Sequence, residues 1–266
     1  MAIAKECGLN VIPTERVRRG ELPKQLDYPI FTKATNSLNP YWKANTFICY
    51  NETELLDAYS KMGIDEVLLQ KYIVKKDETP IEGISIDGGR EVKLLIKKTS
   101  YRFEPNGFGV FSQLLPFTDD ELEQKITTFM QKSRYTGIFE VEFILGEKGN
   151  SYFMEINFRN TMFNHACANC GVNILWLYAK WTIDNHINVA DATFSNINTY
   201  VMYELDDLKA SVVHGNLSLF EWLRDFRMTG SFLYVDKFDM GPFWSLLRRK
   251  TINAIGEGIK LRRHRH

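Results

Sequence analysis

Two acidic side chains are predicted to face each other across a β-hairpin formed by residues 137–145 and 151–159. Side chains alternate between the two faces of a strand, and in each of these strands one face is apolar. With the turn centred between residues 148 and 149, the apolar faces coincide and Glu142 lies directly opposite Glu155. Like charges in this position destabilise a strand pair by a few tenths of a kcal/mol to about 1 kcal/mol, so a compensating cation is expected.

The next pair on the same face, Glu140 and Asn157, makes this surface rich in oxygen ligands. Mg²⁺ prefers carboxylate and amide oxygens together with substrate phosphates. Two interpretations stay open. Either Glu142, Glu155 and Asn157 hold a metal ion, or the face is exposed to solvent and Arg159, which continues it, neutralises the glutamates.

The composition is that of an ordinary globular protein and excludes disorder, collagen and coiled coil. The chain has 266 residues, of which 44% are apolar, and its 33 basic and 33 acidic side chains balance. Zero net charge argues against a nucleic-acid partner. The longest apolar run, residues 174–183, is much shorter than the roughly 20 residues that cross a bilayer. Because there is no recognisable signal peptide and there are only four cysteines, we expect a cytoplasmic protein.

Strand and helix patterns alternate along the chain, which predicts an α+β fold built on hairpins. Residues 87–89, Asp-Gly-Gly, are a predicted turn between two strands, and the charged residues 74–79 are predicted to be an exposed loop. The predicted strands lie at residues 28–33, 46–50, 67–73, 81–86, 92–96, 138–145 and 151–157. The predicted helices lie at residues 1–7, 51–62, 118–136 and 173–181, with capping boxes at Asn51 and Glu54 and at Thr118 and Glu121.

The acidic strands, which end in Phe-Met-Glu-Ile-Asn-Phe-Arg at residues 153–159, resemble the metal-binding signature of the ATP-grasp superfamily. Residues 28–33 are similar to the first nucleotide-binding strand of that family, and residues 67–73 to the hinge strand whose backbone contacts adenine. The resemblance covers residues 1 to about 185. It points in particular to carboxylate–amine ligases, such as D-aspartate ligases, and to the ATP-binding domain of carbamoyl-phosphate synthase. It implies an α+β ATP-grasp fold in which two subdomains clasp a nucleotide.

The resemblance also implies which residues surround ATP and its metal. Lysines would contact the phosphates as point charges, the hinge would contact adenine above an apolar floor, and an acidic residue would accept hydrogen bonds from the ribose. The implied residues are Lys33 and Lys43 for the phosphates, Gln70, Lys71, Tyr72 and Ile73 for adenine with Ile144 as the floor, and Asp77 or Glu78 for the ribose. Mg²⁺, with Mn²⁺ as a substitute, would be held by Glu142, Glu155 and Asn157.

The implied activity is that of an ADP-forming carboxylate–amine or carboxylate–thiol ligase, which activates a carboxylate as an acyl phosphate. Lys98, Arg102 and Arg159 are the residues implied to stabilise the transferred phosphoryl group. For Lys98 and Arg102 the alternative is a solvated strand end. The alternative function is a non-catalytic nucleotide-binding or assembly module that needs a partner domain. Small-molecule carboxylates and amines are the expected partners, and no transmembrane segment is expected.

Two features depart from the family pattern. The loop at residues 34–45 contains no glycine, so side chains rather than backbone amides would have to cover the phosphates. Only a short helix precedes the nucleotide-binding strands, whereas family members carry an α/β domain there. We expect that N-terminal domain to be absent, or to be supplied by a homo-oligomer or another partner. The expected domains are an ATP-grasp domain at residues 1–185 and a C-terminal α/β extension at residues 186–266.

The C-terminal region, residues 220–249, combines aromatic and basic side chains, and the chain ends in a basic tail at residues 261–266. A stretch of this kind can lie on a membrane surface, or it can pack against the main domain. The sequence leaves both interpretations open.

Overall fold

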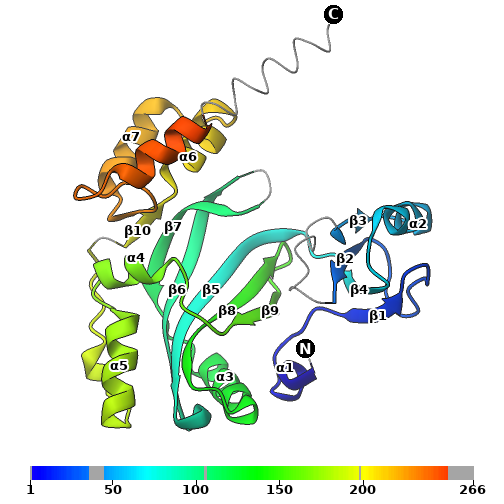
Figure 1. Cartoon of the computed structure of the whole chain (residues 1–266), viewed down its shortest axis with the longest axis horizontal. Helices are drawn as coiled ribbons and strands as arrows, with labels where there is room; N and C mark the ends of the chain where they lie inside the picture. Colours follow the sequence, from blue (N-terminus) through cyan, green and yellow to red (C-terminus); the bar gives the residue numbers. More distant parts are fainter. Residues whose placement is uncertain (1, 36–44, 105–106, 198, 251–266) are drawn as a thin grey trace, which may run out of the picture. The chain divides into compact units, whose positions relative to one another are not determined.

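The computed structural model describes residues 2–35, 45–104, 107–197 and 199–250 (Figure 1). The chain forms two compact units, one from Met1–Lys76 and Phe143–Glu155 and the other from Asp77–Glu142 and Ile156–His266. We call them unit 1 and unit 2. Lys43 and most of the glycine-free loop lie outside the described residues.

Unit 1 contains a four-stranded antiparallel sheet in the order β1-β4-β2-β3. Its strands are β1 (Thr14–Arg18), β2 (Ile30–Ala34), β3 (Ile48–Cys49) and β4 (Glu66–Lys71), and its helices are α1 (Ala2–Glu6) and α2 (Glu52–Lys61). Leu55 of α2 is fully buried in one apolar cluster with Leu69 of β4. The predicted cap of α2 is confirmed, because the Asn51 side chain accepts a hydrogen bond from the Glu54 N–H.

The second sheet has seven strands in the order β11-β10-β7-β6-β5-β8-β9. Its strands are β5 (Lys75–Ile86), β6 (Glu91–Phe103), β7 (Gly109–Pro116), β8 (Gly137–Gly146), β9 (Ser151–Asn157), β10 (Tyr200–Met202) and β11 (Ser231–Phe232). The predicted hairpin turn at residues 87–89 is confirmed, since Ile86 of β5 pairs with Glu91 of β6. Gly88 and Gly89 have φ angles of 63° and 86°, which glycine adopts without steric cost.

The prediction of an exposed loop at residues 74–79 is wrong, because β5 already begins at Lys75. The neighbouring strand β6 runs on to Phe103, and Asp77 accepts a hydrogen bond from the backbone of Ser100 in that strand. Asp77 is accordingly buried. Hydrogen bonding to a long partner strand outweighs the low strand propensity of the charged residues.

The helices of unit 2 are α3 (Asp120–Ser133), α4 (Asn164–Asn169), α5 (Ile174–Asp184), α6 (Glu204–Asp207) and α7 (Leu219–Met228), together with a helix over residues 241–250. Trp181 of α5 is fully buried among apolar side chains of the sheet. The N-cap of α3 is Asp119, whose side chain accepts a hydrogen bond from the Leu122 N–H, so the prediction of Thr118 is wrong by one residue. Aspartate is a somewhat stronger N-cap than threonine.

The fold class is confirmed as α+β, with one antiparallel and one mixed sheet. β10 pairs with β7 in the second sheet, so the residues after 185 share a compact unit with earlier strands. The boundary after residue 185 stays a prediction. Among the described residues, no helix combines the length and the apolar character needed to cross a bilayer.

Candidate functional site

The hairpin face of unit 2 gathers carboxylate and amide side chains, as the sequence predicts. Glu140 on β8 is 5% exposed, and the Asn157 side-chain amide donates hydrogen bonds to it at 3.2 Å and to Glu142 at 2.7 Å. Because the amide nitrogen of Asn157 donates to these two carboxylates, its side-chain carbonyl oxygen is the atom that can bind a cation. Glu140, Glu142 and Asn157 therefore form one contiguous polar group.

The turn of this hairpin differs from its predicted position. The Gly146 N–H donates a 2.9 Å hydrogen bond to the Asn150 carbonyl, which leaves three residues in the turn and centres it on Lys148. The predicted centre, between residues 148 and 149, is therefore wrong by half a residue. The direct opposition of Glu142 and Glu155, which was derived from that centre, stays a prediction.

A third carboxylate, Glu82 on β5, lies beside Glu140 in unit 2. Glu82 is 3% exposed and accepts a hydrogen bond from the Thr161 hydroxyl, while its Oε2 atom finds no hydrogen-bond partner among the described residues. Burial raises the pKa of Glu82 to about 7. Burial, and next the like charge of Glu82, raises the pKa of Glu140 to about 7. Ionisation of both carboxyl groups, Glu82 and Glu140, is therefore energetically unfavourable, and a bound proton or a nearby cation would stabilise the pair.

Lys98 on β6 is the cation of this cluster. It is 5% exposed, so the alternative of a solvated strand end is wrong for this residue. Its ammonium lies 4.0 Å from the ring centroid of Phe163 and 5.5 Å from that of Phe108. Burial lowers the pKa of Lys98, and the charge of Glu140 is the largest influence that opposes this shift. Within the described part of the chain, the ammonium forms no hydrogen bond or ion pair.

Arg102, also on β6, lies in a different environment. Its guanidinium donates two hydrogen bonds to Asp207, at 2.8 and 2.7 Å, and one to Asp225 at 2.6 Å. It also stacks over the Phe111 ring, 3.9 Å from the centroid. Asp207 belongs to α6 and Asp225 to α7, so Arg102 ties both helices to the sheet. The structure does not bring this side chain together with a group that could carry phosphate.

Unit 1 holds the predicted phosphate contact and one of the predicted metal ligands. The Lys33 ammonium on β2 lies 3.6 Å from the Glu155 carboxylate on β9, and about a third of the lysine side chain is exposed. The pair is therefore accessible to solvent. An ammonium beside a carboxylate is an arrangement that can meet a metal-bound phosphate, with each group contacting the ion of opposite charge.

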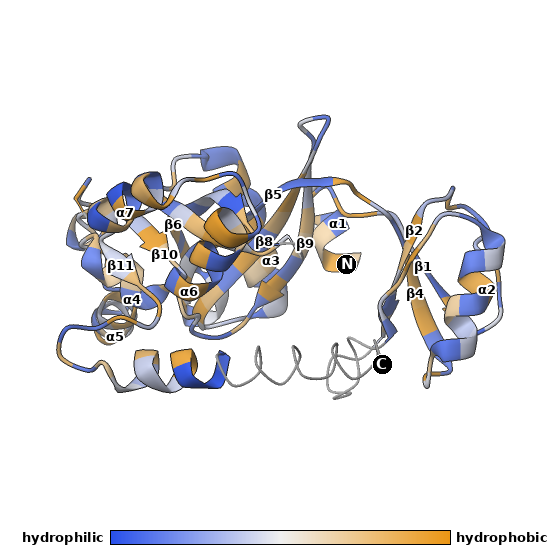
Figure 2. Ribbon diagram, turned by 90° about the horizontal axis from the view of Figure 1, so that it is seen from above, coloured by the Kyte–Doolittle hydropathy of each residue, from blue (hydrophilic) through white to orange (hydrophobic). Residues whose placement is uncertain are grey.

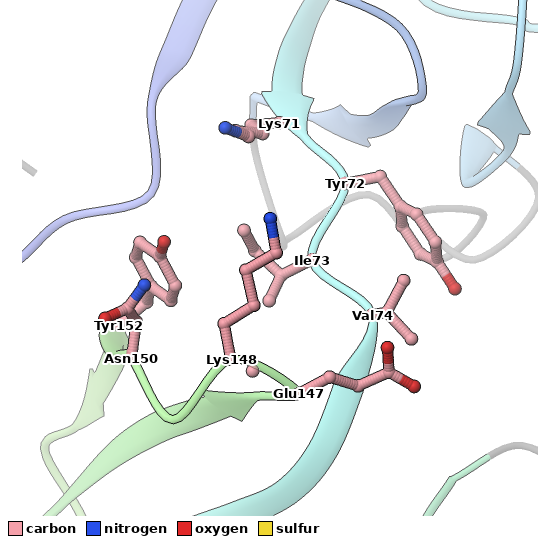
Figure 3. A pocket seen from close by; sticks show the side chains of 9 residues that line it. Lys71, Tyr72, Ile73, Val74, Glu147, Lys148, Asn150 and Tyr152 are labelled. Atoms are coloured by element: carbon pink, nitrogen blue, oxygen red, sulfur yellow. The ribbon is translucent and has the colours of Figure 1, made fainter.

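A cavity of about 210 Å³ adjoins the predicted hinge in unit 1 (Figure 3). Three of the four predicted adenine residues line it, namely Lys71, Tyr72 and Ile73, together with Val74 and the hairpin turn. Figure 3 shows the Ile73 side chain on the side of the hinge that faces Lys148. The hinge is held in place by backbone hydrogen bonds, among them one from the Glu147 N–H to the Val74 carbonyl.

The remaining hinge and floor residues do not line this cavity. The Gln70 amide donates a 2.9 Å hydrogen bond to the Thr14 hydroxyl of β1. Ile144 is half-buried on β8 and is absent from the cavity wall. The adenine roles of these two residues stay predictions.

Asp77 and Glu78, the predicted ribose contacts, lie near the beginning of β5, at the start of unit 2. Asp77 is 8% exposed, and its Oδ1 atom has no hydrogen-bond partner among the described residues. Burial raises the pKa of Asp77, and backbone N–H donors lower it. An unpartnered buried acceptor can take a hydroxyl donor, as the prediction requires. Glu78 is partly buried beside it.

Arg159, the third predicted catalytic residue, is exposed and lies two residues after the end of β9. Its guanidinium donates to the Asn160 carbonyl at 3.3 Å and to the Asn157 side-chain oxygen at 3.5 Å. These are long hydrogen bonds, so little holds the side chain in this position. Arg159 thus lies beside the predicted metal ligand Asn157.

Glu82 and Thr161 are the polar residues that sequence reasoning missed. Their contact joins positions 79 residues apart, which no local pattern reveals. One signal was available: Glu82 interrupts the apolar run Ile81–Ile86, and a charged residue inside a predicted buried strand needs a partner. Among the described residues, no group of three or more histidine, cysteine, aspartate or glutamate side chains is arranged to hold a metal ion. The predicted ligand set has two carboxylates and one amide.

Solved structures share this fold at low sequence identity. The biotin carboxylase domain of Hydrogenobacter thermophilus 2-oxoglutarate carboxylase, in complex with MgADP, ADP and bicarbonate, is 22% identical, with a TM-score of 0.58 over 75% of this chain and 47% of its own. N5-carboxyaminoimidazole synthetase from Staphylococcus aureus is 18% identical, with a TM-score of 0.52 over 73% and 50%. L-amino acid ligase from Bacillus licheniformis is 18% identical, with a TM-score of 0.51 over 68% and 45%.

The similarity is therefore one of fold. No family model and no curated protein matches the sequence. The chain spans about half the length of the solved structures that it resembles. These structures are ATP-grasp enzymes, and their strands and helices match most of this chain, which confirms the predicted architecture. The chain has the ATP-grasp fold.

Proposed function

We propose that this chain binds Mg·ATP and activates a carboxylate as an acyl phosphate, which an amine or a thiol then attacks. A carboxylate oxygen attacks the γ-phosphorus and the bond to the β-phosphate oxygen breaks, so ADP leaves. The nucleophile then attacks the acyl carbon, loses its proton and displaces inorganic phosphate. The observation that carries the proposal is the cluster of Glu140, Glu142, Asn157 and Lys98, which combines candidate metal ligands with a cation. Glu140 and Lys98 are buried, and Glu142 and Asn157 are partly buried.

The residues fit a magnesium ion by their chemistry. Glu142 and Asn157 already share a hydrogen bond, and Glu155 precedes Asn157 by two positions on β9, so both project from the same face of that strand. Burial, and next the like charge of Glu82, raises the pKa of Glu140 beside them, and a divalent cation nearby would stabilise the ionised carboxylate. Bound Mg²⁺ would supply neutralisation of the phosphate charge.

The chain offers residues for the base, the ribose and the phosphates of ATP. The hinge cavity of about 210 Å³ offers apolar contact from Ile73 to the adenine ring. Lys33 would contact the phosphates, together with Lys43 from the glycine-free loop. Asp77 offers an unpartnered oxygen to the ribose. The solved Hydrogenobacter thermophilus domain is a MgADP complex, which supports nucleotide binding by this fold.

Lys98 and Arg159 are the residues that we propose to stabilise the transferred phosphoryl group. Lys98 is a buried ammonium that forms no ion pair among the described residues, so it is available to contact an arriving phosphate, whose charge would add to that of Glu140. Arg159 is exposed beside Asn157 and only weakly held. We leave Arg102 out of the proposed site, because two aspartates already occupy its guanidinium.

One experiment separates this proposal from a module without catalysis. Wild type, Glu142→Gln and the control Glu121→Gln, an exposed carboxylate on α3, are assayed for ADP release with ATP, Mg²⁺ and a panel of carboxylates and amines. We expect release from wild type and from the control, and none from Glu142→Gln. If wild type binds ATP and never releases ADP, the enzyme proposal fails for this chain.

The second candidate is a nucleotide-binding module that works with a partner domain. It is favoured by one observation, namely that the chain spans only about half the length of the ATP-grasp structures that it resembles. Restoration of ADP release by an added partner chain would identify this case.

A further inference from the structure

Charge is unevenly distributed along this neutral chain. Residues 237–266 contain eight basic and only two acidic side chains, so the preceding part of the chain carries a matching excess of acid. The basic residues are Lys237, Arg248, Arg249, Lys250, Lys260, Arg262, Arg263 and Arg265, and the acidic ones are Asp239 and Glu257. A separated block of this kind is a typical site of attraction to anionic surfaces.

The described part of this block, and the residues just before it, are anchored in unit 2. The Glu204 carboxylate of α6 accepts hydrogen bonds from the backbone N–H groups of Tyr234, at 3.0 Å, and Val235, at 2.7 Å. In the helix over residues 241–250, Leu246 is 7% exposed and the Lys250 ammonium pairs with Asp206 of α6. Packing against the main domain, one of the two interpretations of the sequence, therefore describes this part of the segment.

The segment also exposes aromatic and basic side chains. Phe238 is 87% exposed and Trp244 is 59% exposed, and Arg248 lies one helical turn after Trp244. The Lys237 ammonium is 4.8 Å from the centroid of the Phe238 ring. Apolar and hydrophilic turns alternate on this helix, the last one drawn before the grey C-terminal trace (Figure 2). Exposed aromatic rings beside basic side chains form an amphipathic surface.

We propose that residues 237–250 dock onto an anionic lipid surface, with Phe238 and Trp244 entering the boundary between headgroups and acyl chains. Lys237, Arg248 and Arg249 would contact lipid phosphates around them. A nucleic acid would also attract these cations, but it offers no apolar layer for two rings that are largely exposed to water. Aromatic side chains with one apolar and one wet environment are enriched at membrane interfaces.

The test measures co-sedimentation of the full chain with vesicles. Vesicles of phosphatidylglycerol and phosphatidylcholine should pellet the protein, and vesicles of phosphatidylcholine alone should not. Binding should weaken at about 1 M salt, where the Debye length falls to roughly 3 Å. The double variant Arg248→Glu/Arg249→Glu should weaken binding by about tenfold or more, because each basic residue contributes separately to attraction by the surface.

An aromatic double variant distinguishes insertion of the rings into the lipid from attraction by charge alone. Phe238→Ser/Trp244→Ser keeps the net charge and should also weaken vesicle binding by about tenfold, since it removes two inserted rings. The matched control is Trp176→Ser on α5, a tryptophan that is 52% exposed and whose neighbour Lys180 is paired with Asp184. The control should bind as wild type does.

Three results would overturn the proposal. They are equal binding to neutral and anionic vesicles, full binding by the aromatic double variant, and binding to duplex DNA without binding to vesicles. Circular dichroism of each variant confirms that its fold is kept. ADP release does not enter the test, so its outcome is independent of the proposed enzymatic activity.

Discussion

Replacing Glu82 by glutamine should stabilise the protein at neutral and alkaline pH and change little in acid. Burial raises the pKa of Glu82 from 4.5 to about 7, so the folded state holds this proton more tightly than the unfolded chain does. The stabilising contribution of the neutral carboxyl is complete below pH 4.5 and is lost as the pH rises through about 7. Since one pKa unit corresponds to about 1.4 kcal/mol, the loss amounts to about 3 kcal/mol.

Glutamine keeps an oxygen that can accept the Thr161 hydroxyl, and it never ionises. The free energy of unfolding of Glu82→Gln should therefore equal that of wild type in acid and exceed it by about 3 kcal/mol above neutral pH. Urea unfolding followed by circular dichroism, at a series of pH values and with a chelator present, measures this difference. The exposed control Glu121→Gln should show no such pH-dependent gap. Parallel stability curves for Glu82→Gln and wild type would refute the reasoning.

Three further predictions concern the remaining charged residues. Arg102→Met should destabilise the fold by about 3–5 kcal/mol, because it leaves Asp207 buried and uncompensated, and urea unfolding would contradict this with a loss below about 1 kcal/mol. Glu155→Gln should remove Mg²⁺-dependent nucleotide binding while the protein stays folded, and calorimetric titration that finds wild-type affinity for Mg·ATP would disprove its metal role. Lys43→Ala should raise the dissociation constant for ATP about tenfold and leave that for adenosine unchanged, as expected for a charged hydrogen bond of about 1.5–3 kcal/mol. Equal losses for both ligands would show that Lys43 does not contact phosphate.

Local spacing predicted the elements whose stabilising contacts lie close together in sequence. The cap of α2 joins Asn51 to Glu54, and the β5–β6 turn needs only the two glycines at 88 and 89. The beginning of β5 could not be predicted in this way, because charged residues there become a strand only beside the long strand β6. Tertiary pairing overrides local propensity at such positions.

The same distinction holds within the candidate site. Glu140, Glu142 and Asn157 come together because a single hairpin brings them there, and alternation of side chains predicts their common face. The partners of Arg102 lie 105 and 123 residues further along the chain. A single sequence contains no local signal for such a pair, so the charge of Arg102 suggested a ligand where the structure provides two aspartates.

The two basic residues of β6, Arg102 and Lys98, illustrate the difference between a structural ion-pair network and a candidate ligand site. Arg102 is bound by two aspartates and an aromatic face, which satisfies its charge without any ligand. Lys98, four residues earlier, is more deeply buried, and the described residues form no hydrogen bond or ion pair with its ammonium, which lies over the Phe163 ring. Unpartnered oxygens of Glu82 and Asp77 lie in the same unit. Each unsatisfied buried polar group costs about 1–3 kcal/mol, so folding alone gives no reason to keep them. A bound nucleotide and metal would supply the missing partners, and this deficit is the strongest physical argument that the cluster around Lys98 serves binding rather than stability.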